Sequence, residues 1–125
     1  MIEKIDHLVL TCYSIERCVD FYARILGMEA ITFKNNRRAL VFGHEKINLH
    51  EYGKEFEPKA HLPVPGSLDL CFIVSKSIPE VLSHLAENHV DVLEGPVERT
   101  GALGSIVSVY IRDPDLNLIE LSVYK

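Results

Sequence analysis

The pattern of hydrophobic and polar positions occurs twice along the chain. In the first half, a short apolar run precedes a segment with apolar residues at helical spacing, and three further apolar runs follow it. The second half repeats this order after a segment without a clear period. Because a change of hydrophobic period separates strands from helices, the pattern predicts two βαβββ units. The elements are expected at residues 5–10, 14–26, 29–33, 39–42 and 47–51, and again at 67–74, 77–88, 90–93, 106–112 and 118–124.

Both predicted helices begin at a serine. The Ser14 hydroxyl can accept a hydrogen bond from the first helical turn. Ser77-Ile78-Pro79-Glu80 has the order of a capping box with a proline in the first turn, where its missing N–H costs nothing. Gly27 stands where a helix commonly ends in the left-handed conformation. These local signals support both helices independently of the apolar pattern.

The segment between the two units is rich in glycine, proline and charge, which predicts a long connecting loop. Further loops are expected over 34–38, where the asparagines tolerate positive φ, and over 96–104 and 113–117. We therefore predict a single domain over residues 1–125. It consists of a first βαβββ unit at 1–52, a linker at 53–66 and a second unit at 67–125.

The predicted units define an α+β architecture. Each unit should form a short mixed sheet with one helix on its outer face. The other face must also be buried, and its expected partner is the second sheet, curved around a shared metal or ligand cavity. The alternative is a filled core without a site. Polar residues that point inward would distinguish a cavity from a filled core.

The first predicted strand places a histidine opposite its helix-facing residues. Successive strand residues point to opposite faces of a sheet. Leu8 and Leu10 are large and apolar, so they should meet the helix. His7 should therefore face the cavity.

Three other predicted strands carry polar side chains among apolar neighbours. Asn48 and His50 share a face of the fourth strand, and Asp69 lies at the start of the fifth. Glu120 lies in the last strand, and a carboxylate is costly to bury without a compensating cation. Histidine and carboxylate side chains from four strands would suit a divalent metal ion with nitrogen and oxygen ligands.

Several segments follow a pattern known from one protein family. The segments are Ile5-Asp6-His7-Leu8-Val9-Leu10, Phe21-Tyr22-Ala23-Arg24-Ile25-Leu26-Gly27-Met28 and Arg112-Asp113-Pro114-Asp115-Leu116-Asn117-Leu118-Ile119-Glu120-Leu121. Over essentially all of its length, the chain resembles the vicinal oxygen chelate, or glyoxalase/bleomycin-resistance/dioxygenase, superfamily. Ile47-Asn48-Leu49-His50-Glu51 and Pro65-Gly66-Ser67-Leu68-Asp69 resemble its glyoxalase domain-containing and lactoylglutathione-lyase-like members more closely.

The resemblance implies a metal site with one ligand from each of the first, fourth, fifth and last strands. His7 and Glu120 match two of these positions. The fourth-strand position, commonly Glu, is Asn48, and His50 on the same face could substitute for it. The fifth-strand position, commonly His, matches Asp69, although a gapless alignment of the two units pairs His7 with a leucine instead. Zn, Ni, Mn and Fe are all compatible with these donor types.

The resemblance also implies an activity. It is a metal-dependent lyase or isomerase of the glyoxalase type, acting on a small oxygen-chelating substrate such as a glutathione hemithioacetal. Glu120 is the first candidate for the catalytic base and His50 the second. Asn48, Arg38 and Arg99 are candidate substrate-binding residues, the two arginines for an anionic tail. The alternatives are a non-catalytic protein that binds a small molecule in the same fold, or epimerase or dioxygenase chemistry.

Composition and net charge limit the classes of molecule that the protein is expected to bind. The 125 residues are 47% hydrophobic and carry 13 Lys+Arg against 18 Asp+Glu, a net charge of −5. Such values are typical of a globular chain, and the negative charge argues against nucleic-acid and membrane partners. The sequence lacks a signal-peptide pattern and a long apolar run, and we expect a cytoplasmic (intracellular) protein with reduced cysteines. Exposed sheet edges favour a homodimer.

Overall fold

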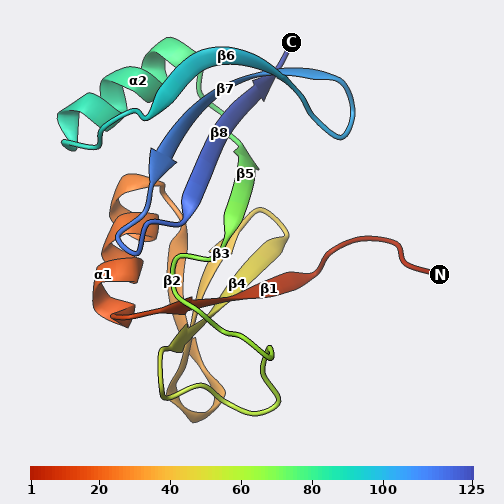
Figure 1. Ribbon diagram of the computed structural model, residues 1–125, viewed down its shortest axis with the longest axis vertical. Helices are drawn as coiled ribbons and strands as arrows, with labels where there is room; N and C mark the ends of the chain where they lie inside the picture. Colours follow the sequence, from red (N-terminus) through yellow and green to blue (C-terminus); the bar gives the residue numbers. More distant parts are fainter. The chain divides into compact units, whose positions relative to one another are not determined.

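In the computed structural model, which describes residues 1–125, the βαβββ order expected from the sequence occurs twice. Each unit has its own four-stranded mixed sheet, which confirms the predicted α+β class. The two compact units comprise Met1–Ser67 and Leu68–Lys125. Figure 1 colours the first unit from red to yellow-green and the second from green to blue. No helix has the length and apolar character that a membrane span requires.

The first unit forms a sheet in the order β1-β4-β3-β2. Strand β1 runs parallel to β4, and the other neighbouring strands are antiparallel. The elements are β1 (His7–Cys12), α1 (Ile15–Val19), η1 (Asp20–Ile25), β2 (Glu29–Phe33), η2 (Lys34–Asn36), β3 (Arg37–Phe42) and β4 (Glu45–Glu51).

The helix of the first unit changes type along its length. Ser14 caps it as predicted, because its hydroxyl accepts a hydrogen bond from the Arg17 N–H at 3.3 Å. The α-helical turn of α1 then widens into the π-helical η1. The Met28 N–H donates to the Tyr22 carbonyl at 3.0 Å. Gly27, directly before Met28, ends the helix in the left-handed conformation at φ 79°. The predicted helical segment and its left-handed end are therefore confirmed, with a π-helical half that the sequence pattern did not indicate.

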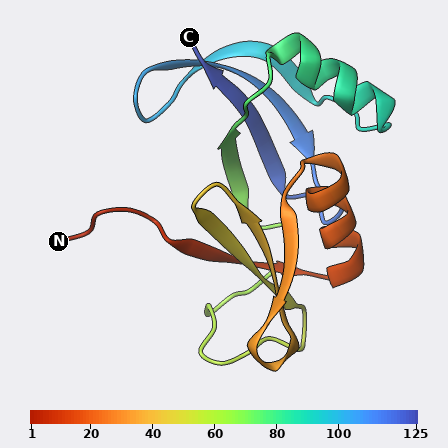
Figure 2. The ribbon, with the colours of Figure 1, turned by 180° about the vertical axis from the view of Figure 1, so that it is seen from behind.

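The helix covers one face of this sheet (Figure 2). Side chains on that face are fully or nearly fully buried, among them Leu10, Leu40, Ile47 and Leu49. Tyr22 of η1 is also fully buried. The apolar alternation that predicted these strands thus identifies the side of the sheet that packs on the helix.

The second unit repeats the first in topology. Its elements are β5 (Asp69–Ile73), α2 (Ile78–Glu87), β6 (Glu94–Thr100), β7 (Ser105–Arg112) and β8 (Leu118–Tyr124), with sheet order β5-β8-β7-β6. Strand β5 runs parallel to β8. The capping box of α2 is present, since the Ser77 hydroxyl accepts from the Glu80 N–H and the Glu80 carboxylate accepts from the Ser77 N–H.

The expected strand at 90–93 is wrong, and the strand lies instead at Glu94–Thr100, mostly within an expected loop. The Val90 N–H donates to the Leu85 carbonyl and completes the end of α2. Strand β6 pairs only with β7 and lies at the sheet edge, so most of its side chains are exposed and it lacks an apolar signature. Pro96 is tolerated there because an edge strand needs fewer N–H donors.

A turn with many hydrogen bonds joins β7 to β8. Asp113 Oδ1 accepts from the N–H groups of Asp115 and Asn117, both at 2.9 Å. The Asn117 amide donates to Asp113 Oδ2 at 2.7 Å, and its Oδ1 accepts from the Leu68 N–H at 2.8 Å. Both Asp113 and Asn117 are buried. This turn therefore ties the start of β8 to the residue before β5 and fixes the register in which Glu120 is presented.

Candidate functional site

A hydrogen-bonded carboxylate lies on one face of the second sheet. Ser108 Oγ donates to Glu120 Oε2 at 2.5 Å, and Ser122 Oγ donates to the same oxygen at 3.4 Å. The two serine hydroxyls are 2.7 Å apart and both side chains are fully buried. Ser108 pairs with Ser122 and Tyr110 pairs with Glu120 across β7 and β8, so these four side chains share one face. The half-buried carboxylate is thereby held in a defined orientation.

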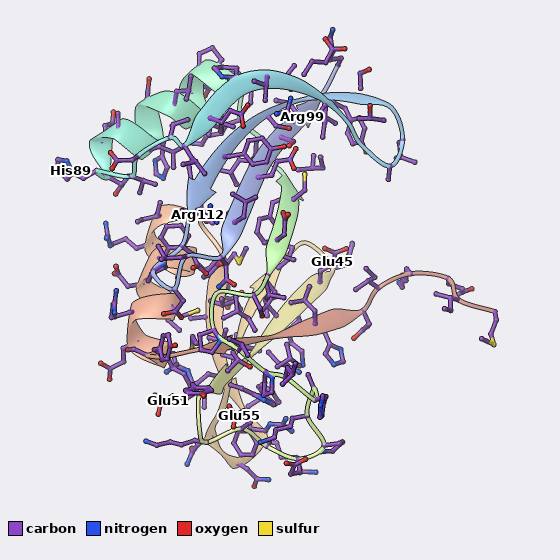
Figure 3. All side chains as sticks on the ribbon, in the orientation of Figure 1. Glu45, Glu51, Glu55, His89, Arg99 and Arg112 are labelled. Carbon is purple, nitrogen blue, oxygen red and sulfur yellow. The ribbon has the colours of Figure 1, made fainter.

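Tyr110 and Arg99 extend this face toward the sheet edge. Arg99 Nε donates to the Tyr110 hydroxyl at 3.2 Å, and its Nη2 donates to Glu94 Oε1 at 3.2 Å. Burial raises the pKa of Tyr110, and the Glu120 carboxylate adds to that rise. Figure 3 labels Arg99 on β6. The candidate substrate-binding residue Arg99 thus engages neighbours within its own unit.

The predicted fifth-strand ligand, Asp69, has less support. Asp69 begins β5 and is exposed, and its side chain makes no hydrogen bond or ion pair. Cys71, two residues on, pairs with Glu120 in the β5–β8 register, and its Sγ lies 3.3 Å from Ser122 Oγ. Burial raises the pKa of the Cys71 thiol, which keeps it protonated and disfavours a thiolate ligand at neutral pH.

His7 lies in the first unit and has a carboxylate beside its ring. Its side chain is 44% exposed, and its Nδ1 is 2.7 Å from Asp6 Oδ2. The hydrogen bond with the His7 imidazole also holds the pKa of the Asp6 carboxyl below its usual value. Histidines that bind a metal through Nε2 commonly carry such a carboxylate at the other ring nitrogen.

A second polar group is buried on the first sheet. His50 is 4% exposed and Asn48 is 9% exposed. Both ring nitrogens of His50 and the Oδ1 of Asn48 lack a hydrogen-bond partner. The ring of Phe56, from the segment after β4, packs edge-on against His50 at 5.7 Å between centroids. Burial, followed by the positive charge of Arg37, lowers the pKa of His50, so its imidazole is neutral at neutral pH.

Arg38 does not share this face. It pairs with Leu49, whose side chain is opposite to those of Asn48 and His50. Its Nε is buried without a hydrogen-bond partner. The arginine on the His50 face is Arg37, whose guanidinium lies 4.7 Å from the Phe56 ring centroid.

Sequence reasoning missed Arg37, Phe56 and the two serines beside Glu120. The alternation of β3 would have identified Arg37 if the strand had been started at residue 37 rather than 39. Ser108 and Ser122 could only be found by knowing the register of β7 on β8. No local sequence signal indicates Phe56.

The candidate ligands for a divalent metal ion differ in how well their surroundings suit metal binding. No three His, Cys, Asp or Glu side chains gather closely enough to hold a metal ion. His7 and Glu120 each have the hydrogen-bonded support that metal ligands usually carry. Asp69 lacks it. His7 and Glu120 are therefore the two candidate ligands whose own hydrogen bonds suit a metal-binding role.

Known proteins match the chain along its whole length. The family model described as Glyoxalase/Bleomycin resistance protein/Dioxygenase superfamily matches residues 4–121. Glyoxalase domain-containing protein RDO1 of Mycosarcoma maydis is 56% identical over 124 residues, which are 99% of this chain and 70% of that protein.

Solved structures of the same architecture include relatives of high sequence identity. Virulence protein STM3117 of Salmonella typhimurium is 57% identical over 99% of this chain and 86% of its own length. Its crystal structure superposes on this chain with a TM-score of 0.98, and the match covers 100% of this chain and 99% of the crystallised chain. A lactoylglutathione lyase from Agrobacterium tumefaciens is 20% identical, with a TM-score of 0.73 over 98% of this chain and 94% of its own. At that identity the likeness shows the fold alone.

Proposed function

The chain belongs to the Glyoxalase/Bleomycin resistance protein/Dioxygenase superfamily, and from this membership we propose that it is a metal-dependent lyase or isomerase of the glyoxalase type. Its substrate would be a small molecule with adjacent oxygen atoms, such as a glutathione hemithioacetal. The observation that carries the proposal is the Glu120 carboxylate, which two buried serine hydroxyls hold at one oxygen.

Glu120 would move a proton between neighbouring carbons of the substrate. A base of this kind must be ionised and correctly oriented before the substrate arrives. The Ser108 and Ser122 hydroxyls supply the orientation, because both donate to the same oxygen of the Glu120 carboxylate. The Tyr110 hydroxyl, polarised by Arg99, lies across the strand pair from Glu120 and could donate to a substrate oxygen.

A divalent ion, when bound, would stabilise negative charge on the two substrate oxygens as a Lewis acid. We propose Glu120 as a ligand of this ion, and His7 and Asp69 remain the other ligands expected from the resemblance. His7 is oriented for this by Asp6. The His50 imidazole remains the second candidate for a base, and its neutral state suits that role.

Metal content and turnover test this proposal together. We expect stoichiometric metal in the unaltered protein and its loss in His7→Ala and Glu120→Ala. Turnover of a panel of hemithioacetals should fall about 100-fold or more in Glu120→Gln, because general-base catalysis contributes about that much. His44→Ala and Glu16→Gln, at exposed positions without a described contact, should leave both quantities unchanged. No metal at any concentration, with folded variants, would contradict the proposal.

One observation favours a second candidate function, the sequestration of a small molecule without chemistry. The fourth-strand position that is commonly Glu in this family is Asn48 here, and an amide is a weak ligand for a divalent ion. Asn48 and His50 nevertheless keep buried polar atoms available for a ligand. Tight binding of a hemithioacetal or its product without turnover, in protein loaded with metal, would support this candidate.

A further inference from the structure

The buried polar atoms of β4 lack partners within the protein. His50 Nδ1, His50 Nε2 and Asn48 Oδ1 are all buried without a hydrogen bond. Buried polar groups in folded proteins are almost always satisfied by protein, water or a ligand. The three atoms lie on two residues of the same strand face. One small polar group placed between them could reach both side chains.

A positive charge lies beside this face without a matching negative one. Arg37 forms no ion pair, and its guanidinium is held by ring faces, 5.6 Å from the Phe33 centroid and 4.7 Å from the Phe56 centroid. The nearby Glu55 carboxylate is already engaged, since it accepts from the Gly53 N–H and lies 3.5 Å from Lys59 Nζ. Figure 3 labels Glu55 in the segment that follows β4. A negative charge on a ligand would balance Arg37.

The unpaired atoms also specify the uncharged part of a ligand. A neutral imidazole offers one donor and one acceptor, and an amide oxygen offers an acceptor. A hydroxyl is both a donor and an acceptor, so it can accept from the His50 N–H and donate to Asn48 Oδ1. A carboxylate alone would leave the Asn48 oxygen unpaired, because it has no proton to donate.

We propose that this face of the first unit binds a small hydroxycarboxylate, with its carboxylate beside Arg37 and its hydroxyl between His50 and Asn48. Phe56 covers the site, because its ring contacts both His50 and Arg37. The ligand would therefore enter when the segment carrying Phe56 moves aside. This proposal rests on the second candidate function and names its ligand class, and it involves neither a metal ion nor Glu120.

Calorimetric titration of the full chain in the presence of a chelator tests the proposal with three matched probes. The probes are 2-hydroxypropionate, propionate and 2-hydroxypropanamide. We expect 2-hydroxypropionate to bind about tenfold more tightly than either other probe, because one lacks the hydroxyl and the other the charge. Equal affinity for all three, or no binding of 2-hydroxypropionate at millimolar concentration, would overturn the proposal.

Variants then locate the binding. Arg37→Gln should weaken 2-hydroxypropionate about tenfold and leave 2-hydroxypropanamide unchanged. His50→Leu should remove the advantage of 2-hydroxypropionate over propionate. Arg17→Gln, an exposed arginine of the same unit, is the control. Shifts of the His50 ring nitrogens on titration of the unaltered protein, followed by ¹⁵N NMR, give a readout that does not depend on a variant folding. Unshifted ring nitrogens, or unaltered binding in Arg37→Gln, would contradict the site.

Discussion

Two polar side chains, the half-buried Glu120 and the buried His50, differ in the hydrogen bonds that they receive. The Glu120 carboxylate receives two serine hydroxyls, whereas the His50 imidazole receives no hydrogen bond. A satisfied group contributes to stability, and an unsatisfied buried group costs about 1–3 kcal/mol. Function and stability therefore coincide at Glu120 and conflict at His50.

Replacing His50 should stabilise the fold. We expect His50→Leu to raise the free energy of unfolding by about 1–2 kcal/mol, because it removes two unpaired buried nitrogens and keeps most of the side-chain volume. Urea unfolding measures this. His44→Leu, at an exposed position, is the control. A loss of stability in His50→Leu would mean that its nitrogens are already satisfied in solution.

The same residue predicts a pH dependence. The pKa of His50 is lowered by burial and then by the charge of Arg37; Glu55 opposes this, and Lys59 adds a still smaller lowering effect. The unfolded chain, with a histidine pKa of about 6.5, therefore takes up a proton more readily. Stability contributed by neutral His50 is present above that value and is lost as the pH falls below it. We expect the unfolding free energy of the unaltered protein to drop more steeply from pH ~6.5 to ~5 than that of His50→Leu. Parallel curves would refute this.

Ser108 should matter to activity more than to substrate affinity. Removing its hydroxyl leaves Glu120 Oε2 with the longer bond from Ser122 alone. If Glu120 moves the proton, Ser108→Ala should lower kcat about tenfold, as expected for one hydrogen bond to a charged group, and change KM little. Steady-state kinetics on the substrate identified by the panel measure this, with the exposed Ser105→Ala as control. Unchanged kcat would remove the serine from the mechanism.

The sequence predicted which residues are candidates for the site better than it predicted the side chains that surround them. Alternation along a strand is a local property, so it could place Asn48 and His50 on one face of β4. Arg37 was not among the candidates, and the strand expected at 39–42 began two residues after the observed start of β3. Support from partners distant in the chain, such as Ser108 beside Glu120, depends on strand register, which the pattern does not specify.

At the scale of elements, β6 shows how an edge strand escapes prediction. Strand β6 has a neighbouring strand, β7, on one side only, so it needs few apolar side chains. The capping box of α2 and the left-handed turn at Asn35 and Asn36 were predictable because neighbouring residues determine them. The π-helical η1 was not, because a widened turn leaves the apolar spacing nearly unchanged.

One glycine holds β6 against β7. Gly95 has φ 110°, and a Cβ there would meet the Ser108 carbonyl oxygen at 2.5 Å. Gly104 has φ 145° with nothing within 4 Å, so it carries the backbone strain without the clash. We expect Gly104→Ala to cost about 1–3 kcal/mol of unfolding free energy and Gly95→Ala to cost more. Chemical denaturation compares them, and equal losses would show that the close approach is relieved by movement of β7.

At the scale of the whole molecule, the repeat is the feature that the sequence showed best. Both units place their first strand parallel to their last and their helix after that first strand. The duplicated pattern of periods was visible without any knowledge of long-range contacts. The sequence pattern did not show that the two units carry different polar groups. The second unit holds the Glu120 carboxylate with its serines, and the first holds the unpaired imidazole and amide.

We expect the protein to form a homodimer. Strand β5 is a sheet edge, and its Ile73 is 56% exposed, which favours pairing with another copy. Light scattering should give the mass of a dimer at micromolar concentration. Ile73→Lys should shift the equilibrium toward monomer, whereas Leu103→Lys, in the β6–β7 loop and 89% exposed, should not. Monomer alone at every concentration would contradict the prediction.

The opposite edge of the same sheet has the reverse character, with a consequence for behaviour at high concentration. Strand β6 carries Glu94, Pro96, Glu98 and Arg99. Charge and proline on an edge prevent strands of different molecules from adding to it. The polar composition of β6, which made the strand hard to predict from apolar residues, thus also protects this edge against aggregation. Strand β5 is then the edge of the second sheet through which two molecules can associate without open-ended growth.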